Sequence, residues 1–336
     1  MATRLNWGII ATGGIARAFA RGVAHSQQGR LAAVASRTAA GAQAFAAEFG
    51  IPRAHGSYEA LLADPDVTAV YIATPHAQHV EWVERAAAAG KHVLCEKPLG
   101  LTRAEAVRAV EAARRHGVLL MEAFMYRCHP QTAKILEIVR SGVLGEVRLV
   151  QAAFGFANPF DAANRFWNRE LGGGGILDVG CYPVSFARLI AGAIDGAPFA
   201  DPVRVSGAVE RHPAAGVDTC AAATLHFANG LIAQVSTSIA LMQENVARIY
   251  GTKAWLLVPE PWVPVRESGA TELRLFRGAD KEPEIIRLET DRWLYSLEAD
   301  AFAAALAAGR REVPAMSPDD TLGNMAVLDA WAGVAP

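Results

Sequence analysis

Cysteine is scarce in this sequence, and its few copies are scattered. The four cysteines include no Cys-x-x-Cys pair; they are Cys95, Cys128, Cys181 and Cys220. This spacing favours neither a disulfide framework nor a zinc cluster, so we expect no metal centre. Unpaired cysteines are typical of a reducing compartment, and we therefore expect a cytoplasmic protein.

An excess of charge of one sign is also missing. The chain has 32 lysine and arginine residues against 34 aspartate and glutamate residues, a formal net charge of −2. Nucleic acids and anionic membranes are therefore poor partners. The amino terminus enters a strand-like apolar run without a secretory signal, and we expect no apolar stretch long enough to span a bilayer.

The first third of the chain predicts a parallel sheet. From residue 5 to about 122, short β-rich runs alternate with helical stretches in the order of repeated βαβ units, which is typical of a doubly wound sheet. One helix is expected to begin with Thr102 and Glu105 in capping-box spacing and to stop at Gly117. The expected strands are 5–11, 31–36, 69–73, 92–95 and 118–122.

The rest of the chain has a different pattern. A helix over 130–142 and a long strand over 147–156 are followed by a loop, a helix over 176–193 and several β-rich stretches from residue 202 on. Asn229-Gly230 separates two of these stretches, which indicates an antiparallel hairpin. Helices over 294–308 and from Ser317-Pro318 on close the chain.

These patterns predict two domains, because 336 residues exceed what one hydrophobic core usually supports. The fold class is α/β. Residues 1–125 are expected to form a Rossmann domain with a doubly wound parallel sheet. Residues 126–336 are expected to form an α+β domain with a mostly antiparallel open sheet for substrate binding and oligomerisation, and the last helices are candidates to pack back on the first domain.

A glycine-rich turn follows the first expected strand. Residues 11–16 read Ala-Thr-Gly-Gly-Ile-Ala, a variant of the dinucleotide fingerprint with Ala11 in place of the usual first glycine. Small residues let the backbone approach a pyrophosphate, while the helix that follows presents unpaired N–H groups. Because alanine adds only one methyl group, we expect the turn to retain nucleotide binding.

The end of the second expected strand indicates which nucleotide is bound. An enzyme that prefers NAD places an acidic residue there, against the ribose hydroxyl. This chain has Ser36-Arg37-Thr38 instead. A guanidinium pairs with a 2′-phosphate, and the hydroxyls add hydrogen bonds, so the segment favours NADP over NAD.

Two further segments end expected strands at the same edge of the sheet. Residues 73–79 read Ala-Thr-Pro-His-Ala-Gln-His, and residues 95–98 read Cys-Glu-Lys-Pro. Ligands of open α/β sheets bind at this edge. Lys97 is one of only five lysines in the chain, and its ammonium could hydrogen-bond a reacting hydroxyl.

A glycine run introduces a candidate acid/base helix. Gly172–Gly175 precede Asp178 and Tyr182, which helical geometry would place one turn apart on one face. Alcohol oxidation needs a group that takes the hydroxyl proton, and a lysine cation lowers the pKa of a neighbouring phenol. Tyr182 with Lys97 could fill this role. A buried tyrosine satisfied by an aspartate is the structural alternative.

These motifs together resemble the Gfo/Idh/MocA oxidoreductases. The order of the glycine turn, Thr-Pro-x-x-x-His, Glu-Lys-Pro, the Glu-Ala-Phe-Met-Tyr-Arg segment at 122–127 and the Gly-Gly-Gly-x-x-x-Asp-x-Gly-x-Tyr segment ending at Tyr182 is that of the family. The sequence looks closest to the branch with dimeric dihydrodiol dehydrogenase and NADP-dependent aldose (xylose) 1-dehydrogenases, because Tyr182 stands where inositol dehydrogenases have histidine.

The resemblance implies an NADP-dependent dehydrogenase that acts on a carbinol carbon of an aldose, sugar derivative or cyclic trans-diol. Lys97 and Tyr182 would be the catalytic pair, with Asp178 orienting the substrate. The expected cofactor contacts are Thr12, Gly13, Gly14, Ile15, Ala16, Ser36, Arg37, Thr38, Thr74, Pro75, His79, Glu96 and Arg127. Candidates for the substrate pocket are Phe154, Phe156, Asn164, Trp167 and Trp262.

Two other functions stay open on the sequence. The same site could reduce keto groups of nucleotide-linked sugars, or the chain could be a regulatory protein that binds NADP without turnover. A short-chain dehydrogenase is excluded, because no tyrosine has a lysine four residues later. An antiparallel sheet with one helix-free face would be buried against a second copy, so we expect a homodimer or homotetramer.

Overall fold

The computed structural model describes residues 4–278 and 282–334. The described chain divides into two compact units. The first unit holds the chain up to Cys128 together with Asp291–Thr321, and the second holds His129–Thr290 and the chain from Leu322 on.

The first unit contains the expected parallel sheet. Its strand order is β3-β2-β1-β4-β5-β6, and every pair is parallel. The strands are β1 (Leu5–Ile10), β2 (Gly29–Ala35), β3 (Arg53–His55), β4 (Ala69–Ile72), β5 (His92–Glu96) and β6 (Leu120–Ala123). The short β3 was not predicted. The order reverses between β1 and β4, and ligands of such sheets bind outside the carboxyl ends of the strands at this switch point.

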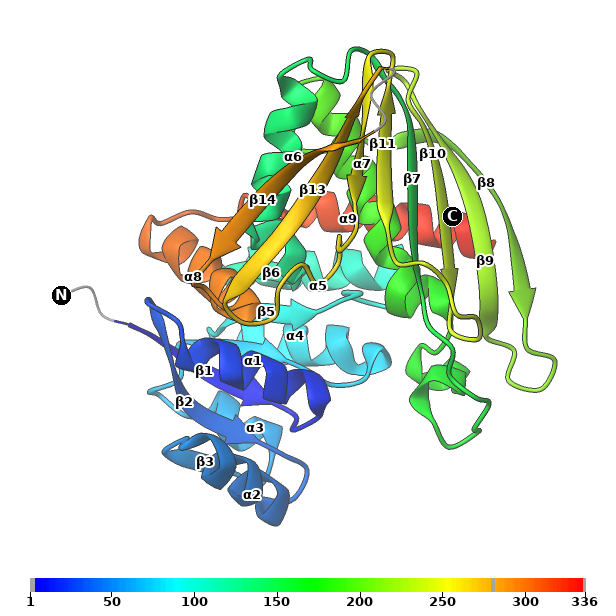
Figure 1. The fold of residues 1–336 in the computed structure, drawn as a ribbon. Coiled ribbons are helices and arrows are strands. Elements are labelled where there is room, and N and C mark those ends of the chain that lie inside the picture. Colours follow the sequence, from blue (N-terminus) through cyan, green and yellow to red (C-terminus); the bar gives the residue numbers. More distant parts are fainter. Residues whose placement is uncertain (1–3, 279–281, 335–336) are drawn as a thin grey trace. The chain divides into compact units, whose positions relative to one another are not determined.

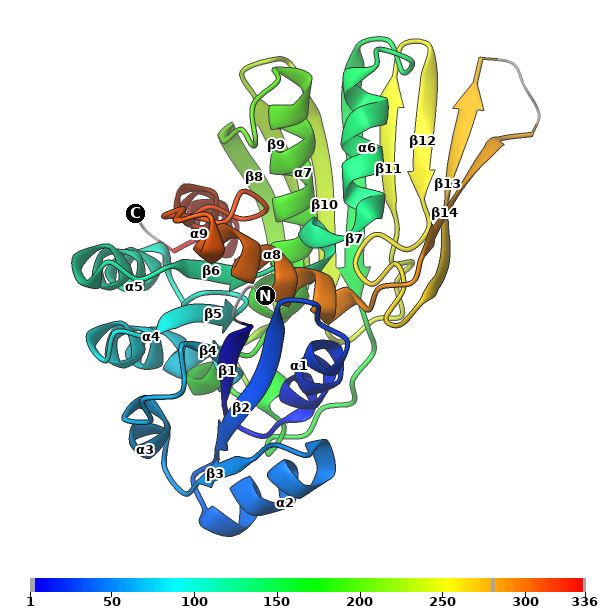
Figure 2. The same ribbon diagram turned by 90° about the vertical axis from the view of Figure 1, so that its left-hand side faces the viewer.

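Helices cover both faces of this sheet, which is why its strands are almost continuously apolar. Figure 2 shows α4 and α5 on one face and α1 on the other. Helix α5 follows the prediction, since Thr102 caps it through the N–H of Glu105 and Gly117 ends it in a left-handed conformation. The helices are α1 (Gly14–Ala24), α2 (Ala39–Phe49), α3 (Tyr58–Leu62), α4 (His79–Ala88), α5 (Arg103–His116) and, from late in the chain, α8 (Leu294–Ala307).

Helix α8 is fixed to the end of α1 within the first unit. The buried carboxylate of Asp300 accepts hydrogen bonds from the N–H groups of Gln27 and Gln28, each at 3.0 Å, and from the Ser26 hydroxyl. Arg292 forms an ion pair with the same carboxylate. The segment therefore completes the first unit, although it lies about 170 residues beyond its last strand.

The second unit is built on the predicted, mostly antiparallel sheet. Its order is β14-β13-β12-β11-β7-β10-β9-β8, and β7 with β10 is its parallel pair (Figure 1). Asn229-Gly230 forms the expected hairpin turn between β9 and β10. The strands are β7 (Val147–Gly155), β8 (Pro202–Arg211), β9 (Asp218–Phe227), β10 (Ile232–Ser238), β11 (Ala247–Gly251), β12 (Ala254–Val258), β13 (Gly269–Arg277) and β14 (Glu284–Thr290).

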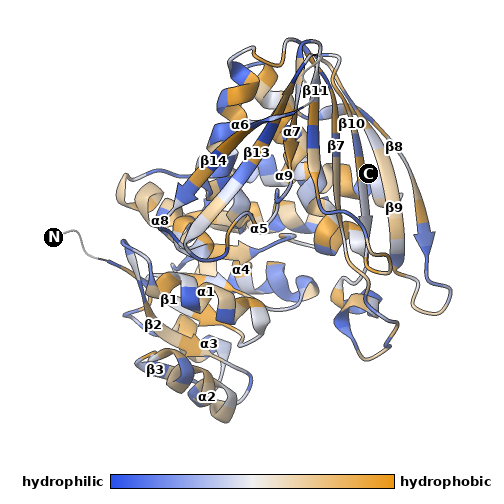
Figure 3. Ribbon diagram, viewed as in Figure 1, coloured by the Kyte–Doolittle hydropathy of each residue, from blue (hydrophilic) through white to orange (hydrophobic). Residues whose placement is uncertain are grey.

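One face of this sheet packs on helices α6 (Pro130–Arg140) and α7 (Cys181–Ile194) (Figure 2). The last helix, α9 (Pro318–Ala332), crosses the division between the units. The other sheet face is half polar, as the alternation of hydrophilic and hydrophobic residues along β13 and β14 shows in Figure 3. This alternation is the pattern of a sheet covered on one side.

The expectation that no apolar stretch could span a bilayer is wrong. Within the described residues, Arg169–Ile194 is long and apolar enough, with a mean hydropathy of 1.3. However, 94% of its most apolar window is buried inside the protein. Every residue from Cys181 to Ala193 is buried against the sheet and its neighbouring helices, which accounts for the apolar composition.

Candidate active site

The glycine turn after β1 has the space that a dinucleotide needs. A Cβ atom added to Gly13 or to Gly14 would have no heavy atom within 4 Å. Helix α1 begins at Gly14 with no side-chain cap and no acidic residue in its first turn, so its N–H groups and positive dipole end stay available to an anion. Residues 11–16 thus form a cradle that a pyrophosphate would fill.

Ala11 carries backbone strain, which the small size of its methyl group does not reveal. Its φ is +79°, and it is the one non-glycine residue with positive φ in the described part of the chain. A Cβ atom is unfavourable in this left-handed conformation, which is why glycine is usual at the position. The strain is retained at the phosphate turn, where strained backbone is often part of a binding site.

Replacing Ala11 with glycine should relieve this strain. We expect the Ala11→Gly variant to gain about 1 kcal/mol in the free energy of unfolding, measured by denaturant titration. Ala16, in helix α1, provides the control, since glycine in a helix costs about 1 kcal/mol. A loss of stability at Ala11 equal to that at Ala16 would contradict the strain argument.

In the segment after β2, Arg37 and Thr38 have different environments. Arg37 is exposed, and its charge acts on Tyr58, whose pKa is raised by burial and lowered to a lesser degree by this guanidinium. Thr38 caps α2 by accepting a hydrogen bond from the N–H of Gly41 at 3.2 Å. Arg37 therefore presents a cation beside the carboxyl end of β2, while Thr38 has a structural bond.

The carboxyl ends of β4 and β5 lie at the same edge as the glycine turn. The buried hydroxyl of Thr74 has no hydrogen-bond partner among the described residues, so a ligand atom or a water molecule could occupy its free position. Lys97 follows β5 directly and is half-buried. The open turn, the Thr74 hydroxyl and Lys97 thus share one sheet edge within the first unit.

Three of the expected cofactor contacts have buried partners instead. His79 is fully buried and bonds two backbone carbonyl groups. Glu96 accepts a hydrogen bond from the hydroxyl of Tyr71. Arg127 forms a buried ion pair of 2.6 Å with Asp320. A direct contact of these side chains with a nucleotide stays a prediction, and the bonds observed here hold the sheet edge in shape.

Another buried carboxyl group in the first unit belongs to Glu298 on α8. It is 0% exposed, and neither of its oxygens has a hydrogen-bond partner among the described residues. Burial, and to a lesser degree the charge on Glu96, raise the pKa of Glu298 well above its ordinary value. The shift therefore favours the protonated, uncharged form of this buried group.

This raised pKa predicts a pH-dependent stability. A pKa raised on folding stabilises the native state fully below the unfolded value of about 4.3, and this contribution is lost as the pH rises toward the folded value. Glu298→Gln removes the titration, so the free energy of unfolding of the variant should rise relative to that of the wild type as the pH increases above the unfolded value. Denaturant titrations at pH 5 and pH 8 measure this gain. The exposed Glu111, changed to glutamine, should show a constant difference, and a constant difference for Glu298→Gln would refute the prediction.

In the second unit, Asp178 and Tyr182 lie on a helix whose start is not regular. Residues Ile176–Gly180 form a π-helical turn, and α7 continues from Cys181. The buried carboxylate of Asp218 accepts a hydrogen bond from the N–H of Ile176 at 2.7 Å and fixes this start. Burial raises the pKa of Asp218, while the backbone N–H donors lower it. We had expected an ordinary α-helix here; π-turns of this kind are frequent at functional sites.

The Asp178 carboxylate has a partner that the sequence did not reveal. The guanidinium of Arg165 lies 3.0 Å from the buried carboxylate and also lies over the ring of Phe166. Arg165 comes from the loop after β7, and only the fold brings it to Asp178. It is 43% exposed, so the ion pair is open to solvent at one end.

Two of the proposed pocket aromatics lie against Tyr182. Phe154 packs edge-on to the Tyr182 ring with centroids 5.2 Å apart, and the Trp262 ring lies 5.9 Å from it. The other three are placed elsewhere in the unit. Trp167 is buried with Val217 and Ile239, Phe156 borders that small core, and Asn164 caps the 3-10 turn Arg165–Trp167. Their contact with a substrate stays a prediction.

The described residues contain no group of His, Cys, Asp or Glu side chains that could hold a metal ion. The first unit and its glycine turn define a dinucleotide-binding α/β protein. A model of the oxidoreductase family with an NAD-binding Rossmann fold matches residues 5–124, and a model of the GFO/IDH/MocA C-terminal domain matches residues 132–257. The chain belongs to the GFO/IDH/MocA oxidoreductase family.

Similar proteins agree with this assignment. The chain is 37% identical to the D-xylose 1-dehydrogenase (NADP(+)) 2 of Haloferax volcanii, over 96% of this chain and 95% of the relative. It is 38% identical to the trans-1,2-dihydrobenzene-1,2-diol dehydrogenase of Mus musculus, over 77% of this chain and 76% of the relative. Among solved structures, a 3-ketoreductase from Actinomadura kijaniata in complex with NADP and TDP-benzene superimposes with a TM-score of 0.87 at 28% identity, over 99% of this chain and 98% of the other.

Proposed function

We propose that this protein is an NADP-dependent dehydrogenase that acts on a CH–OH group of an aldose, a sugar derivative or a cyclic trans-diol. One observation carries the proposal: the open glycine turn, Lys97 and the Thr74 hydroxyl, which has no partner among the residues that the structure describes, lie at one edge of the parallel sheet. The named dehydrogenase relatives, which cover most of the chain, support it.

The cofactor would be NADP rather than NAD. Gly13 and Gly14 leave room for the pyrophosphate, and Arg37 provides a cation where an acidic residue would select the ribose hydroxyl of NAD. When bound there, NADP⁺ would supply the acceptor for the hydride from the carbinol carbon. Residues of the chain would carry out the remaining steps.

Tyr182 and Lys97 would carry the proton chemistry. The phenolate oxygen of Tyr182 takes the hydroxyl proton of the substrate as the hydride leaves. The Lys97 ammonium stabilises that phenolate by its charge and donates a hydrogen bond to the reacting oxygen. Asp178 accepts a hydrogen bond from a second substrate hydroxyl, while Phe154 and Trp262 offer apolar faces to the ring. The pairing of Lys97 with Tyr182 belongs to this proposal.

The activity is tested with a panel of aldoses, inositols and trans-dihydrodiols, following reduction of NADP⁺ and of NAD⁺ by absorbance. Turnover of at least one substrate class with NADP⁺ supports the proposal. Tight NADPH binding without turnover of any substrate, unaffected by Lys97→Ala, would instead support the non-catalytic regulatory alternative.

Arg37 gives a separate test of the cofactor. In Arg37→Ala we expect the KM for NADP⁺ to rise about 10- to 100-fold, because a charge-assisted bond to the 2′-phosphate is lost, while the KM for NAD⁺ stays unchanged. Arg21, exposed on α1, is the matched control. An equal effect of Arg37→Ala on both nucleotides would contradict a role in phosphate recognition.

A ketoreductase of nucleotide-linked sugars is the second candidate, favoured by the likeness to the 3-ketoreductase structure. The same residues would then work in reverse, with Tyr182 donating a proton to the carbonyl oxygen, and bound NADPH would be the source of the hydride. Kinetics with free aldoses against nucleotide-linked keto sugars separates the two. A kcat/KM higher by orders of magnitude for the nucleotide-linked substrate would favour the ketoreductase.

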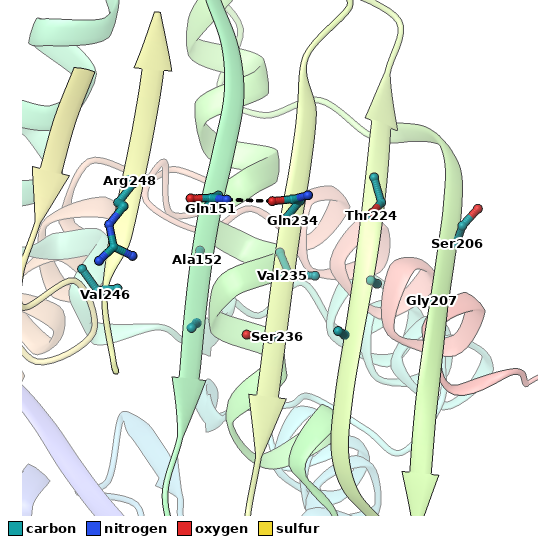
Figure 4. Close-up of a pocket in the computed structure, with 13 residues that line it drawn as sticks. Gln151, Ala152, Ser206, Gly207, Thr224, Gln234, Val235, Ser236, Val246 and Arg248 are labelled. Atoms are coloured by element: carbon teal, nitrogen blue, oxygen red, sulfur yellow. Dashed lines mark hydrogen bonds between the residues drawn. The ribbon is translucent and has the colours of Figure 1, made fainter. Parts of the chain in front are cut away.

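We further propose that the protein is a homodimer, or a homotetramer built from dimers, formed through the helix-free face of the large sheet. On this face Tyr250, Trp255 and Phe276 stack across three strands, with centroid distances of 5.4 and 3.9 Å. Beside them, Gln151 donates a hydrogen bond of 2.8 Å to Gln234 across a shallow groove of about 540 Å³ (Figure 4). A half-apolar, half-polar face of this kind suits a second copy of itself.

Light scattering tests the assembly. A mass of two or four chains that falls to one chain in Trp255→Arg supports it, and a monomeric wild type refutes it.

We also propose a cytoplasmic location without nucleic-acid or membrane partners, supported by the four free cysteines and the near-neutral net charge. Cell fractionation tests the location, and binding assays with DNA and with anionic vesicles test the partners.

A further inference from the structure

The backbone that carries Lys97 is held at three successive residues by buried side chains. The Lys97 N–H donates to the carboxylate of the preceding Glu96 at 3.2 Å. The Pro98 carbonyl accepts from Nδ1 of His79 at 2.8 Å. The Leu99 N–H donates to Oε1 of Glu122 at 2.9 Å. These three side chains come from β5, α4 and β6, so three elements of the first unit fix one short segment.

His79 also joins this segment to the carboxyl end of β4. Its Nε2 lies 2.9 Å from the carbonyl oxygen of Thr74, while its Nδ1 bonds Pro98. The ring thus bridges two backbone segments, with one nitrogen within hydrogen-bond distance of each carbonyl oxygen. His79 is fully buried, and the carboxyl groups of Glu96 and Glu122 accept hydrogen bonds from the adjoining N–H groups of Lys97 and Leu99.

Neither His79 nor Glu122 is open to solvent. Glu122 is 1% exposed and His79 is 0% exposed. Burying polar groups costs free energy unless they are hydrogen-bonded, and buried hydrogen-bonded side chains fix the geometry of the groups that they hold. The segment that they hold carries Lys97. Among the described strands of the first unit, β5 is the one that is directly followed by a lysine.

We propose that Glu122 and His79 are positioning residues that fix the backbone of Lys97 and thereby the location of its ammonium group. This inference rests on the proposed function of Lys97. A backbone shift of about 1 Å at such a residue can lower a rate by about 10²-fold, because the hydrogen bond to the reacting oxygen depends on alignment.

Glu122→Ala tests the proposal. We expect kcat to fall by about 10²-fold while the dissociation constant for NADPH, measured by fluorescence, stays unchanged, since the glycine turn and Arg37 are untouched. Glu122→Gln should recover most of the loss, because its amide oxygen can accept from the Leu99 N–H. If Glu122→Ala does not fold, Glu122→Asp is measured instead. Its shorter side chain keeps the carboxyl group and moves the acceptor oxygen away from the Leu99 N–H. His79→Gln, which can reach only one carbonyl, should also lower kcat.

Glu105 provides the matched control. Its carboxylate accepts a hydrogen bond from the N–H of Leu101 at 2.8 Å, two residues further along the same segment, as part of the cap of α5. Glu105→Ala should lower the melting temperature and leave kcat unchanged. In a Lys97→Met background, Glu122→Ala should have no further effect on kcat, because both changes remove one function. Wild-type kcat in folded Glu122→Ala, or full additivity with Lys97→Met, would overturn the proposal.

Hydrogen exchange separates this inference from the proposed function. The Leu99 amide should exchange faster in Glu122→Ala than in the wild type, and the Leu101 amide faster in Glu105→Ala. If no substrate is turned over but Leu99 is deprotected in this way, the proposed function fails and the segment is still held by Glu122. If Leu99 exchange is unchanged, the positioning role fails, whatever the activity.

Discussion

Tyr182→Phe is expected to lower kcat by about 10²- to 10⁴-fold, because the variant keeps the ring and loses the oxygen that takes the substrate proton. NADPH affinity should stay at the wild-type value, since Tyr182 lies in the second unit and the nucleotide cradle is in the first. Stopped-flow fluorescence for binding and absorbance for turnover measure the two effects separately.

Tyr250→Phe is the matched control for this result. Tyr250 lies in the same unit, and its hydroxyl bonds Gln151 on the helix-free sheet face at 3.1 Å. The control should leave kcat unchanged. Lys97→Met should lower kcat in the same way as Tyr182→Phe, and the double variant should be little worse than either, as for groups that act as a unit. Wild-type turnover by Tyr182→Phe would remove Tyr182 from the mechanism.

Gly174→Ala is expected to cost about 3 kcal/mol in the free energy of unfolding and to reduce activity strongly. Gly174 has a φ of +110°, and a Cβ atom there would lie 2.2 Å from Oδ1 of Asp218. The carboxylate would have to leave the N–H of Ile176, which it holds at 2.7 Å. The start of the π-turn that carries Asp178 would then lose its support. Urea titration and kcat measure the two losses.

Gly50→Ala separates backbone strain from the clash. Gly50 has a φ of +63°, and a Cβ atom there would meet no heavy atom within 4 Å. The control should therefore cost only about 1 kcal/mol and leave kcat unchanged. Equal costs at Gly174 and Gly50 would show that the contact with Asp218 does not matter.

The first sheet could be predicted because its signals are local. Buried parallel strands read as apolar runs, and Thr102, Glu105 and Gly117 mark the ends of α5 by their own bonds. The hairpin at Asn229-Gly230 was predicted for the same reason. Strand β3, with three residues, has too little pattern to be recognised.

The candidate site could be predicted only in part. The residue types at the strand ends and after the glycine run predicted that Lys97, Asp178 and Tyr182 are catalytic residues. The bonds that hold their surroundings join residues far apart in the sequence: Asp218 to Ile176, Arg165 to Asp178, and Glu122 to Leu99. No local pattern contains these pairs, because they form only when separate elements pack.

The sequence by itself determined which elements form and which groups carry chemistry, since periodicity, caps and turn residues act over a few positions. The tertiary structure decided what each buried polar group bonds. It placed the cation of Arg165 on Asp178 and gave His79 two carbonyl partners, while the carboxyl group of Glu298 has no hydrogen-bond partner among the described residues. It also showed that Ala11 occupies a left-handed conformation. Burial makes these arrangements specific, because a polar group removed from water must find its partner within the fold or change its protonation.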